Sequence, residues 1–487
     1  MSSNSERIVG LRGLELCNPI RANLYDAAAI RSLEQFASRL LPPGVLMERA
    51  GLAVAKLALA LNPHASNFWV ACGPGNNGGD GYIAARHLHQ WGKTVAVSCL
   101  FDTKETQLPV DAMAALESAR QAQVKFVSTP PEQLDVCIDA IFGIGQLRAS
   151  GGNCGQGIEQ INSSNAFRLS VDVPSGLDAS TGEAKQPCVN AHATLTLLGM
   201  KPGLFTGDGR DHCGEIWLND LDVENAPAPT AYLNQKTPPA QRRHNTHKGT
   251  YGDVSVIGGS RGMTGAAILA ATAALNSGAG RVSVGLLDSS RYSLPPPDLM
   301  MREISELAIA NTTLVAGCGG GAAISSWMAE ILQLAERLVL DADALNAIAN
   351  SSELCGLLSR RRHDTTVLTP HPLEAARLLA CSTNEIQSNR LKAAQTLATR
   401  FNCTVVLKGS GTVIASPVHI PHINPSGNAR LATAGTGDVL AGMIGAHMAA
   451  GEPSFVAACS AAFHHGAIAN RWTAAHPLTA RALCDAL

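Results

Sequence analysis

Residues 73–81, GPGNNGGDG, combine five glycines and two asparagines between an apolar run, NFWVAC, and a helical pattern, YIAARHLHQWG. Glycines at a strand-to-helix junction let the main chain turn tightly and approach a ligand closely. The free N–H groups of the following helix, and the positive end of its dipole, would point into this loop and attract an anion. The sequence therefore predicts that a phosphorylated ligand binds at residues 73–81.

Two aspartates stand at the ends of apolar runs in the first half of the chain. Asp139 lies in VCIDAIFGIG, and Asp172 follows FRLSV and precedes VPSGLD. A carboxylate at the tip of a buried strand is costly unless it meets a cation, a donor or a reacting proton. Aspartate also caps helices and ties turns, so this plainer role stays open for both residues.

The second half contains AGTGD, residues 434–438, immediately before the helical pattern VLAGMIGAHM. Consecutive backbone N–H groups at a helix N-terminus form an anion hole for a phosphoryl group. Asp438 could accept a hydroxyl proton while that oxygen attacks a γ-phosphate. The alternative is that Asp438 only stabilises the helix through the helix dipole.

These residues need a scaffold that brings them to the edge of a sheet. Short β-branched runs such as TVAVSCL and FRLSVDVPSG alternate with Ala/Leu-rich helical segments, and the pattern restarts with YGDVSVIGGS, RLVLDADAL and CTVVLKGSGTVI. This alternation predicts parallel strands with crossover helices, hence an α/β fold. In such sheets ligands collect at the carboxyl ends of the strands, where the polar residues above are found.

The segment DVENAPAPTAYLNQKTPPAQRRHN, residues 222–245, interrupts the alternation. It holds four prolines, shows little apolar periodicity and has no strand pattern. We therefore expect a first domain at 1–221, a Pro-rich linker at 222–241 and a second domain at 242–487.

Composition excludes several classes of function. The net charge of -2, from 37 basic and 39 acidic residues, leaves no excess to hold a polyanion, so nucleic acid is not expected as a partner. The longest apolar stretch, AGLAVAKLALAL, contains Lys56 and is too short to span a membrane. The 13 cysteines include no CxxC pair, and the first residues lack a secretory signal. We expect a soluble, cytoplasmic protein with reduced thiols and no zinc site.

The motifs LMERAG, GPGNNGGDGYIAAR, DAIFGIG and VDVPSGLDASTG together resemble the epimerase domain of the NAD(P)H-hydrate repair enzymes, from about Arg31 to Asp220. The resemblance implies a Rossmann-like, three-layer α/β/α domain that interconverts the R and S forms of hydrated NADH and NADPH (NADHX and NADPHX). It implies a K+ ion held by Asn77, Asp139 and Ser175. Oxygen ligands suit such a hard cation better than zinc.

In this family's site, Asp172 would face the altered nicotinamide ring and exchange hydroxyl protons with it. Lys201, in GMKPGLFTG, is either a second polar group of the site or a solvated lysine before a proline. The residues that the resemblance places around the phosphates and ribose are Asn76, Asn77, Gly78, Gly79, Asp80, Gly143, Ile144, Gly145, Gln146, Leu147, Arg148 and Ala149.

From about Arg242 onward, the motifs HKGTYG, VIGGS, DADAL, TPHPLEAARLL, VVLKGSGT and GTGDVLAG resemble the ADP- or ATP-dependent NAD(P)H-hydrate dehydratases, which are ribokinase-like α/β/α enzymes. The resemblance implies that ADP or ATP, with Mg2+, phosphorylates the ring hydroxyl and that phosphate is then expelled. The implied nucleotide-binding residues are Lys408, Gly409, Ser410, Gly411, Thr412 and Gly437. The implied substrate-binding residues are Ala266, Gly321, His371 and Asp438, although His371 could equally be a structural residue ahead of Pro372.

Three departures from the family pattern occur in the second half. The usual GPGLG reads GCGGG at 317–321, the usual GNPG reads GNAR at 427–430, and Ala434 replaces a common glycine. None removes a named catalytic group. The runner-up hypothesis is a ribokinase-like small-molecule kinase fused to a non-catalytic nucleotide-binding module. Family resemblance also implies a homo-oligomer, such as a tetramer, assembled through the second domain.

Overall fold

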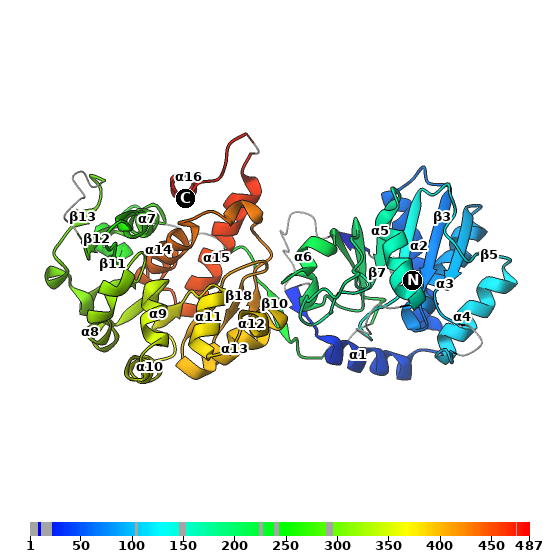
Figure 1. The fold of residues 1–487 in the computed structure, drawn as a ribbon, viewed down its shortest axis with the longest axis horizontal. Coiled ribbons are helices and arrows are strands. Elements are labelled where there is room, and N and C mark those ends of the chain that lie inside the picture. Colours follow the sequence, from blue (N-terminus) through cyan, green and yellow to red (C-terminus); the bar gives the residue numbers. More distant parts are fainter. Residues whose placement is uncertain are drawn as a thin grey trace. The chain divides into compact units, whose positions relative to one another are not determined.

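The computed structural model describes residues 8–10, 22–102, 106–145, 152–223, 227–237, 243–288, 296–473 and 475–487. The chain forms two compact units, Met1–Ala231 and Tyr232–Leu487 (Figure 1). Each unit is built on a mostly parallel sheet with helices, which confirms the predicted two-domain α/β fold class. Within the described ranges, no helix is long and apolar enough to cross a membrane.

The first unit contains strands β1 (Val9–Gly10), β2 (Asn23–Leu24), β3 (Asn67–Cys72), β4 (Thr94–Cys99), β5 (Lys125–Phe126), β6 (Val136–Ala140), β7 (Phe167–Val171), β8 (Ala193–Leu197) and β9 (Glu215–Asn219). Its helices are α1 (Ala27–Leu40), α2 (Val45–Leu61), α3 (Asn76–Gln90), α4 (Val110–Gln121), α5 (Gly152–Ser163), the 3-10 helix η2 (Pro202–Leu204) and α6 (Gly209–His212).

The sheet of the first unit runs β1-β9-β8-β7-β6-β3-β4-β5, and every strand except β1 is parallel to its neighbours. The chain proceeds from β3 outward to β4 and β5, then returns to place β6 on the other side of β3. Loops at such a switch point diverge and leave a crevice at the carboxyl ends of the strands. Because Cys72 pairs with Ala140, the loops that follow β3 and β6 leave the sheet side by side.

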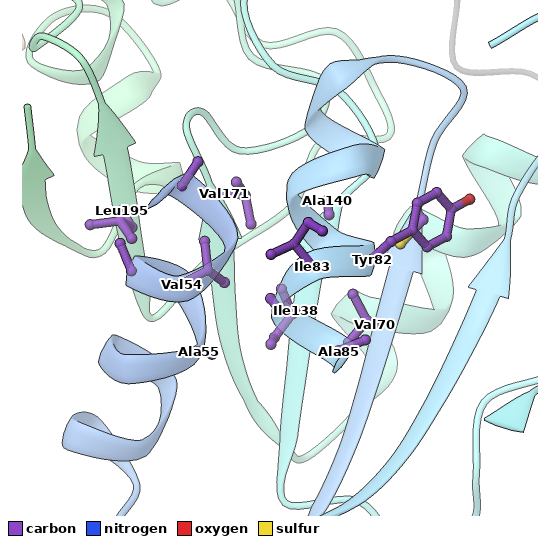
Figure 2. Close-up of a cluster of buried hydrophobic side chains, with 14 of the residues drawn as sticks. Val54, Ala55, Val70, Tyr82, Ile83, Ala85, Ile138, Ala140, Val171 and Leu195 are labelled. Carbon is purple, nitrogen blue, oxygen red and sulfur yellow. The ribbon is translucent and has the colours of Figure 1, made fainter. Parts of the chain in front are cut away.

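Alternating side chains of β3 enter two different cores, as the two-residue period of a strand requires. Phe68 and Val70 pack into a cluster with residues of α2 and α3, whereas Trp69 packs into a second cluster with residues of α5. Figure 2 shows Val54 of α2 and Ile83 of α3 among the side chains of the first cluster. Helices therefore cover both faces of the sheet and fix α3 over its switch point.

The second unit contains β10 (Ala231–Leu233), β11 (Asp253–Gly258), β12 (Arg281–Leu286), β13 (Met300–Met301), β14 (Thr313–Ala316), β15 (Arg337–Leu340), β16 (Thr366–Leu368), β17 (Thr404–Leu407), β18 (Val413–Ala415) and β19 (His422–Ile423). Its helices are η3 (Lys248–Tyr251), α7 (Thr264–Asn276), η4 (Ile304–Glu306), η5 (Ile309–Asn311), η6 (Gly321–Ser326), α8 (Met328–Leu334), α9 (Asp343–Ala349), α10 (Ser352–Ser359), α11 (Pro372–Leu379), α12 (Thr383–Ser388), α13 (Arg390–Phe401), η7 (Ala429–Leu431), α14 (Thr436–Ala449), α15 (Ser454–Arg471) and α16 (Ala480–Asp485).

The sheet of the second unit runs β13-β12-β11-β14-β15-β16-β17-β18-β19-β10. Neighbouring strands are parallel from β13 to β17, and the hairpin strands β18 and β19 then alternate in direction. Helices α7, α14, α15 and α16 contribute to one core with the strands. The ends of β11, β14, β15, β16 and β17 consequently share one edge of the sheet, beside which α14 begins.

One expectation for the predicted linker is wrong. Strand β10 lies within 222–241, where no strand was expected, and pairs in parallel with β19 through Tyr232–His422 and Leu233–Ile423. Ala231 and Leu233 are buried while Tyr232 is half-buried, so a three-residue alternation was enough to form a short strand. Such a short alternation among prolines is too weak a pattern to distinguish from a loop.

Candidate active sites

A cavity of about 750 Å³ lies at the switch point of the first sheet. Its walls come from α1, the start of α3, the loop after β6 and the residue that follows β7. Seven of the predicted site residues line it: Asn76, Asn77, Asp80, Gly143, Ile144, Gly145 and Asp172. Four further predicted residues, Gln146, Leu147, Arg148 and Ala149, lie outside the described residues.

Gly78 and Gly79 do not line this cavity, although the sequence placed both in the binding loop. A β-carbon added at Gly78 would lie 2.1 Å from the carbonyl oxygen of Gly73, and one at Gly79 would lie 2.5 Å from the side chain of Met47. These two glycines therefore allow α3 to pack closely on its surroundings. Of the NNGGD motif, Asn76, Asn77 and Asp80 line the cavity.

One carboxylate oxygen of Asp172 accepts hydrogen bonds, and the other accepts none within the part of the chain that the structure describes. Oδ1 accepts hydrogen bonds from the Leu197 backbone N–H, at 3.1 Å, and from the ammonium of Lys201, with which it forms an ion pair. Oδ2 accepts no hydrogen bond from the described residues. Asp172 also has a φ of +68°, a left-handed conformation that is unusual for a residue with a side chain and that here aims the carboxylate into the cavity.

Lys201 is a buried residue of the site, so its alternative reading as a solvated lysine is wrong. Its side chain has no exposed surface, and Nζ donates to Thr196 Oγ1 at 3.0 Å and to the Leu197 carbonyl at 2.7 Å, besides Asp172. Burying an ammonium requires such partners. Lys201 therefore fixes the orientation of the Asp172 carboxylate.

Asn77 and Asp172 converge on the open space above Gly143. A β-carbon added at Gly143 would lie 3.2 Å from Asn77 Oδ1 and 3.3 Å from Asp172 Oδ2. Asn77 Nδ2 is buried and has no hydrogen-bond partner in the described part of the chain. Buried amide groups are normally paired, so an unpaired one beside a cavity points to a ligand. A small polar group of a substrate could sit here between the two side chains.

Asp139 and Ser175 do not line the cavity, and they contact each other. Ser175 donates its hydroxyl to Asp139 Oδ1 at 2.6 Å and its backbone N–H to Oδ2 at 2.9 Å, while Ser170 donates its hydroxyl to Oδ2 at 2.8 Å. Burial raises the pKa of Asp139, and the hydrogen bonds from Ser175 and Ser170 oppose that shift. The structure thus brings two of the three predicted cation ligands into direct contact.

Two more carboxyl groups of the cavity are Glu34 and Asp80. Burial, followed by the charge of Asp172, raises the pKa of both residues, whereas Lys201 lowers it. Three acidic groups therefore lie within electrostatic range of one another, and the raised pKa values favour the protonated forms of Glu34 and Asp80.

The second site centres on Asp438, in the first turn of α14. The sulfur of Cys318 and carboxylate oxygens of Asp341 and Asp438 all lie within 4.8 Å of one another. Lys408 Nζ donates to Asp341 Oδ1 at 2.6 Å, so an ammonium already neutralises part of this cluster. The loops after β14, β15 and β17 thus meet the N-terminus of α14 at one point.

Burial raises the pKa of Asp438 to about 6, with the charge of Asp341 acting in the same direction. Lys408 and a hydrogen bond with Cys318 oppose the shift. Burial also raises the pKa of the Cys318 thiol, which is therefore the donor in that hydrogen bond. A carboxylate with a pKa near neutrality is suited to accept a proton during turnover.

Two of the predicted nucleotide-binding residues, Lys408 and Gly437, lie at this cluster. Lys408 follows β17 directly, and Gly409, Ser410, Gly411 and Thr412 form the turn between the antiparallel strands β17 and β18. A β-carbon added at Gly437 would lie 3.1 Å from Lys408 Nζ. The free N–H groups at the start of α14 and the Lys408 ammonium consequently face a common space, an arrangement that can hold a phosphate.

The remaining predicted residues lie around the same edge of the sheet. Ala266 is in the first turn of α7, and Gly321 begins η6, where its N–H donates to Asp343 Oδ2 at 2.7 Å. His371 is the N-cap of α11: Nδ1 accepts N–H groups of Leu373 and Glu374 at 3.1 and 3.3 Å. This capping gives His371 a structural role. Its side chain is partly exposed, and its role as a substrate ligand stays a prediction.

Sequence reasoning missed Asp341 as a site residue, although DADAL was part of the family pattern. Its signal was the same as for Asp139 and Asp172, a carboxylate directly after the apolar strand RLVL. Arg31 and Glu34 were also missed. They belong to a helix whose polar face gives no local indication that it borders a cavity.

The fold and the two sites define a two-domain α/β protein with a switch-point cavity in one unit and a cluster of Cys318, Asp341, Lys408 and Asp438 at a helix N-terminus in the other. A family described as YjeF-related protein N-terminus matches residues 43–203. A family described as NAD(P)H-hydrate dehydratase matches residues 254–487.

Full-length relatives agree with this pairing of domains. The chain is 36% identical over 446 residues to the bifunctional NAD(P)H-hydrate repair enzyme Nnr of Escherichia coli, covering 87% of this chain and 84% of the relative. It is 35% identical to the enzyme of the same name from Moorella thermoacetica, covering 91% of each chain. The chain belongs to the family of bifunctional NAD(P)H-hydrate repair enzymes, so the predicted family and enzyme class are confirmed.

A solved structure is also similar to half of the chain. The ADP/ATP-dependent NAD(P)H-hydrate dehydratase of Bacillus subtilis, co-crystallized with ATP and Mg2+, is 31% identical and covers 50% of this chain and 91% of its own, with a TM-score of 0.42.

Proposed function

We propose that the first unit epimerises NADHX and NADPHX with Asp172 as the acid–base residue, and that the second unit dehydrates the S epimer with Asp438 as the base. The convergence of Asp172 Oδ2 and Asn77 on the space above Gly143 carries the first assignment. The Asp438, Asp341 and Lys408 cluster at the start of α14 carries the second. Family membership joins the two reactions in one chain.

In the epimerase site, the ring hydroxyl of the hydrate would sit above Gly143. Asp172 Oδ2 would take the hydroxyl proton and pass it to the ring nitrogen as the adjacent ring carbon–nitrogen bond breaks, leaving an aldehyde and a neutral N–H. When the nitrogen attacks the opposite face of the aldehyde, its proton would return through Asp172 to the aldehyde oxygen, and the ring closes as the other epimer. Lys201 holds Asp172 Oδ1 throughout, so the reacting oxygen keeps its position.

The residues also fit a K+ ion in donor chemistry. Asn77, Asp139 and Ser175 offer oxygen atoms, with one carboxylate among them, and two of the three are in contact. When bound, the ion would stabilise negative charge near the reacting hydroxyl. Thermal unfolding of the full chain in KCl, compared with LiCl at equal ionic strength, tests this assignment without reference to activity. We expect wild type to have a higher Tm in KCl than in LiCl, and Asp139→Ala to have the same Tm in both salts. Equal Tm values of wild type in the two salts would contradict the K+ site.

In the dehydratase site, the hydroxyl proton of the S hydrate would move to Asp438 as the oxygen attacks the terminal phosphorus of ADP or ATP. The bond from that phosphorus to the bridging oxygen breaks, and AMP or ADP leaves. The N–H groups at the start of α14 and the Lys408 ammonium receive the transferred phosphoryl group. Loss of phosphate, and of a proton from the neighbouring ring carbon, then restores the nicotinamide double bond. Phosphate leaves far more readily than hydroxide. Mg2+ bound to the nucleotide would neutralise phosphate charge.

A direct test is to incubate the protein with acid-prepared NADH hydrate and either ADP or ATP, and to follow the absorbance of the reduced nicotinamide. Recovery of NADH that requires both the protein and the nucleotide is expected. The rival hypothesis, a small-molecule kinase, predicts that nucleotide is consumed without recovery of NADH. Comparing ADP and ATP in the same assay also decides which nucleotide is used. Homo-oligomerisation and a cytoplasmic location stay predictions.

A further inference from the structure

The proposed epimerase cavity is lined by more acidic than basic residues, although a dinucleotide substrate is itself negatively charged. The ionisable residues that line it are four acids, Glu34, Asp80, Asp111 and Asp172, and two bases, Arg31 and Arg39. A pyrophosphate carries negative charge at neutral pH and needs positive partners near its path. Among the described residues of the cavity wall, Arg31 and Arg39 are the two bases, and the N-terminus of α3 adds partial positive charge.

Arg31 lies where the cavity meets the loop after β6. Its Nη2 donates to the backbone carbonyls of Ile144 and Gly145, at 3.3 and 3.5 Å. A second cavity of about 240 Å³ is lined by Arg31, the same loop and residues 177–179. Arg31 and residues 143–145 therefore form the border shared by the two cavities.

Arg31 is also near the proposed reaction centre. Glu34, one turn further along α1, has its pKa raised by burial and then by Asp172, and lowered by Lys201 and Arg31. Glu34 therefore lies within electrostatic range of both the reacting carboxylate and the Arg31 guanidinium. If the nicotinamide ring of a dinucleotide lies at Asp172, its pyrophosphate must lie a short distance from that carboxylate, in the region of Arg31.

We propose that Arg31 binds the pyrophosphate of NADHX and NADPHX, at the border between a cavity for the nicotinamide half and a smaller cavity for the adenosine half. The proposal rests on the epimerase function proposed above. A guanidinium has five N–H donors, and its two contacts with the loop use only Nη2, which leaves the remaining N–H groups for phosphate oxygens. Its planar donor geometry matches phosphate well.

Arg39 provides a matched control on the same helix. Both arginines are exposed and line the larger cavity, but Arg39 is eight residues further on, or about 12 Å along the helix axis. It does not line the smaller cavity. Replacing either residue by glutamine removes one charge from α1 and preserves a polar side chain.

The experiment measures epimerisation by the full chain, without added nucleotide, of two hydrated substrates. One is hydrated NADH, and the other is the hydrate of reduced nicotinamide riboside, which has the same ring but no phosphate. With hydrated NADH, Arg31→Gln should lower kcat/KM by roughly 10–100-fold, the usual effect of losing a hydrogen bond to a charged group. This loss should be larger than that of Arg39→Gln, which removes the same charge from the same helix away from the border of the two cavities. With the riboside hydrate, Arg31→Gln should equal wild type.

Two results would overturn the proposal. Unchanged activity of Arg31→Gln on hydrated NADH would show that Arg31 does not bind phosphate. Equal losses on both substrates would show that Arg31 only supports the loop through Ile144 and Gly145.

If wild type epimerises neither substrate, the proposed function fails, and calorimetric titration of wild type and Arg31→Gln with hydrated NADH still decides the role of Arg31. The second unit is identical in both proteins, so weaker binding by Arg31→Gln supports a phosphate contact and equal binding refutes it.

Discussion

Replacing Gly143 by alanine tests the geometry of the epimerase site with a single methyl group. The added β-carbon would lie 3.2 Å from Asn77 Oδ1 and 3.3 Å from Asp172 Oδ2, closer than ordinary van der Waals contact. It would also occupy the space assigned to the substrate hydroxyl. Because Gly143 does not have a left-handed φ, alanine fits its backbone without strain.

The expected loss follows from displacement of the reacting groups. A misplacement of about 1 Å can cost roughly 100-fold in rate, and here the methyl group both shifts the two oxygens and excludes the hydroxyl. Gly143→Ala should therefore lower kcat/KM for epimerisation by about 100-fold or more. Its free energy of unfolding should change by no more than about 1 kcal/mol, because the site is a cavity wall rather than packed core.

The assay starts from the pure R hydrate of NADH and follows appearance of the S form by chromatography, alongside chemical denaturation of the same preparation. Gly356→Ala is the control, because Gly356 lies in α10 of the second unit and an added β-carbon would meet only Arg360 Nη2, at 3.9 Å. It should keep at least about a third of wild-type activity. Near-normal epimerisation by Gly143→Ala would refute the placement of the hydroxyl, and a large loss of stability would make the substitution a folding defect.

Three further substitutions test other parts of the account. Asp139→Ala should abolish epimerisation while dehydration of the S hydrate continues, and equal loss of both activities in a folded protein would refute separate sites. Asp438→Asn should keep nucleotide affinity in calorimetric titration while single-turnover dehydration falls by roughly two to four orders of magnitude, and near-normal turnover would reduce Asp438 to a helix-end acid. Dehydration should require ionised Asp438, so kcat should fall as pH drops through about 6. Asp341→Asn removes a charge that raises the pKa of Asp438, so the kcat of this variant should begin to fall at a lower pH than that of wild type. A fall at the same pH or at a higher pH would contradict Asp438 as the base.

Local patterns predicted the strand ends that carry Asp139, Asp172 and Lys408, because an apolar run followed by polar residues marks where a buried parallel strand leaves the sheet. The glycine-rich start of α3 was predicted for the same reason. Sequence alone did not separate glycines that face a ligand from those that pack. Gly78 and Gly79 belong to the second kind, and only their surroundings in the fold reveal it.

Pairs of distant residues were harder to predict. Lys201 meets Asp172 across 29 positions, and Lys408 meets Asp341 across 67 positions. Lys201 looks solvated when read locally, since lysine is seldom buried without a partner. The resemblance implied that Lys408 binds the nucleotide, but it did not indicate the contact with Asp341. The sheet order supplies the partner, and no periodicity in the chain encodes which strand ends become neighbours.

The claim that two separate sites act in sequence is tested most directly by supplying the R hydrate of NADH with ADP or ATP and measuring NADH formed. Wild type should convert all of the R hydrate, because epimerisation feeds dehydration. Asp172→Asn should form NADH only as fast as the R hydrate epimerises without catalysis, yet should dehydrate the S hydrate at the wild-type rate. Asp438→Asn should equilibrate R with S and form almost no NADH. Full conversion of the R hydrate by Asp172→Asn at the wild-type rate would contradict the account.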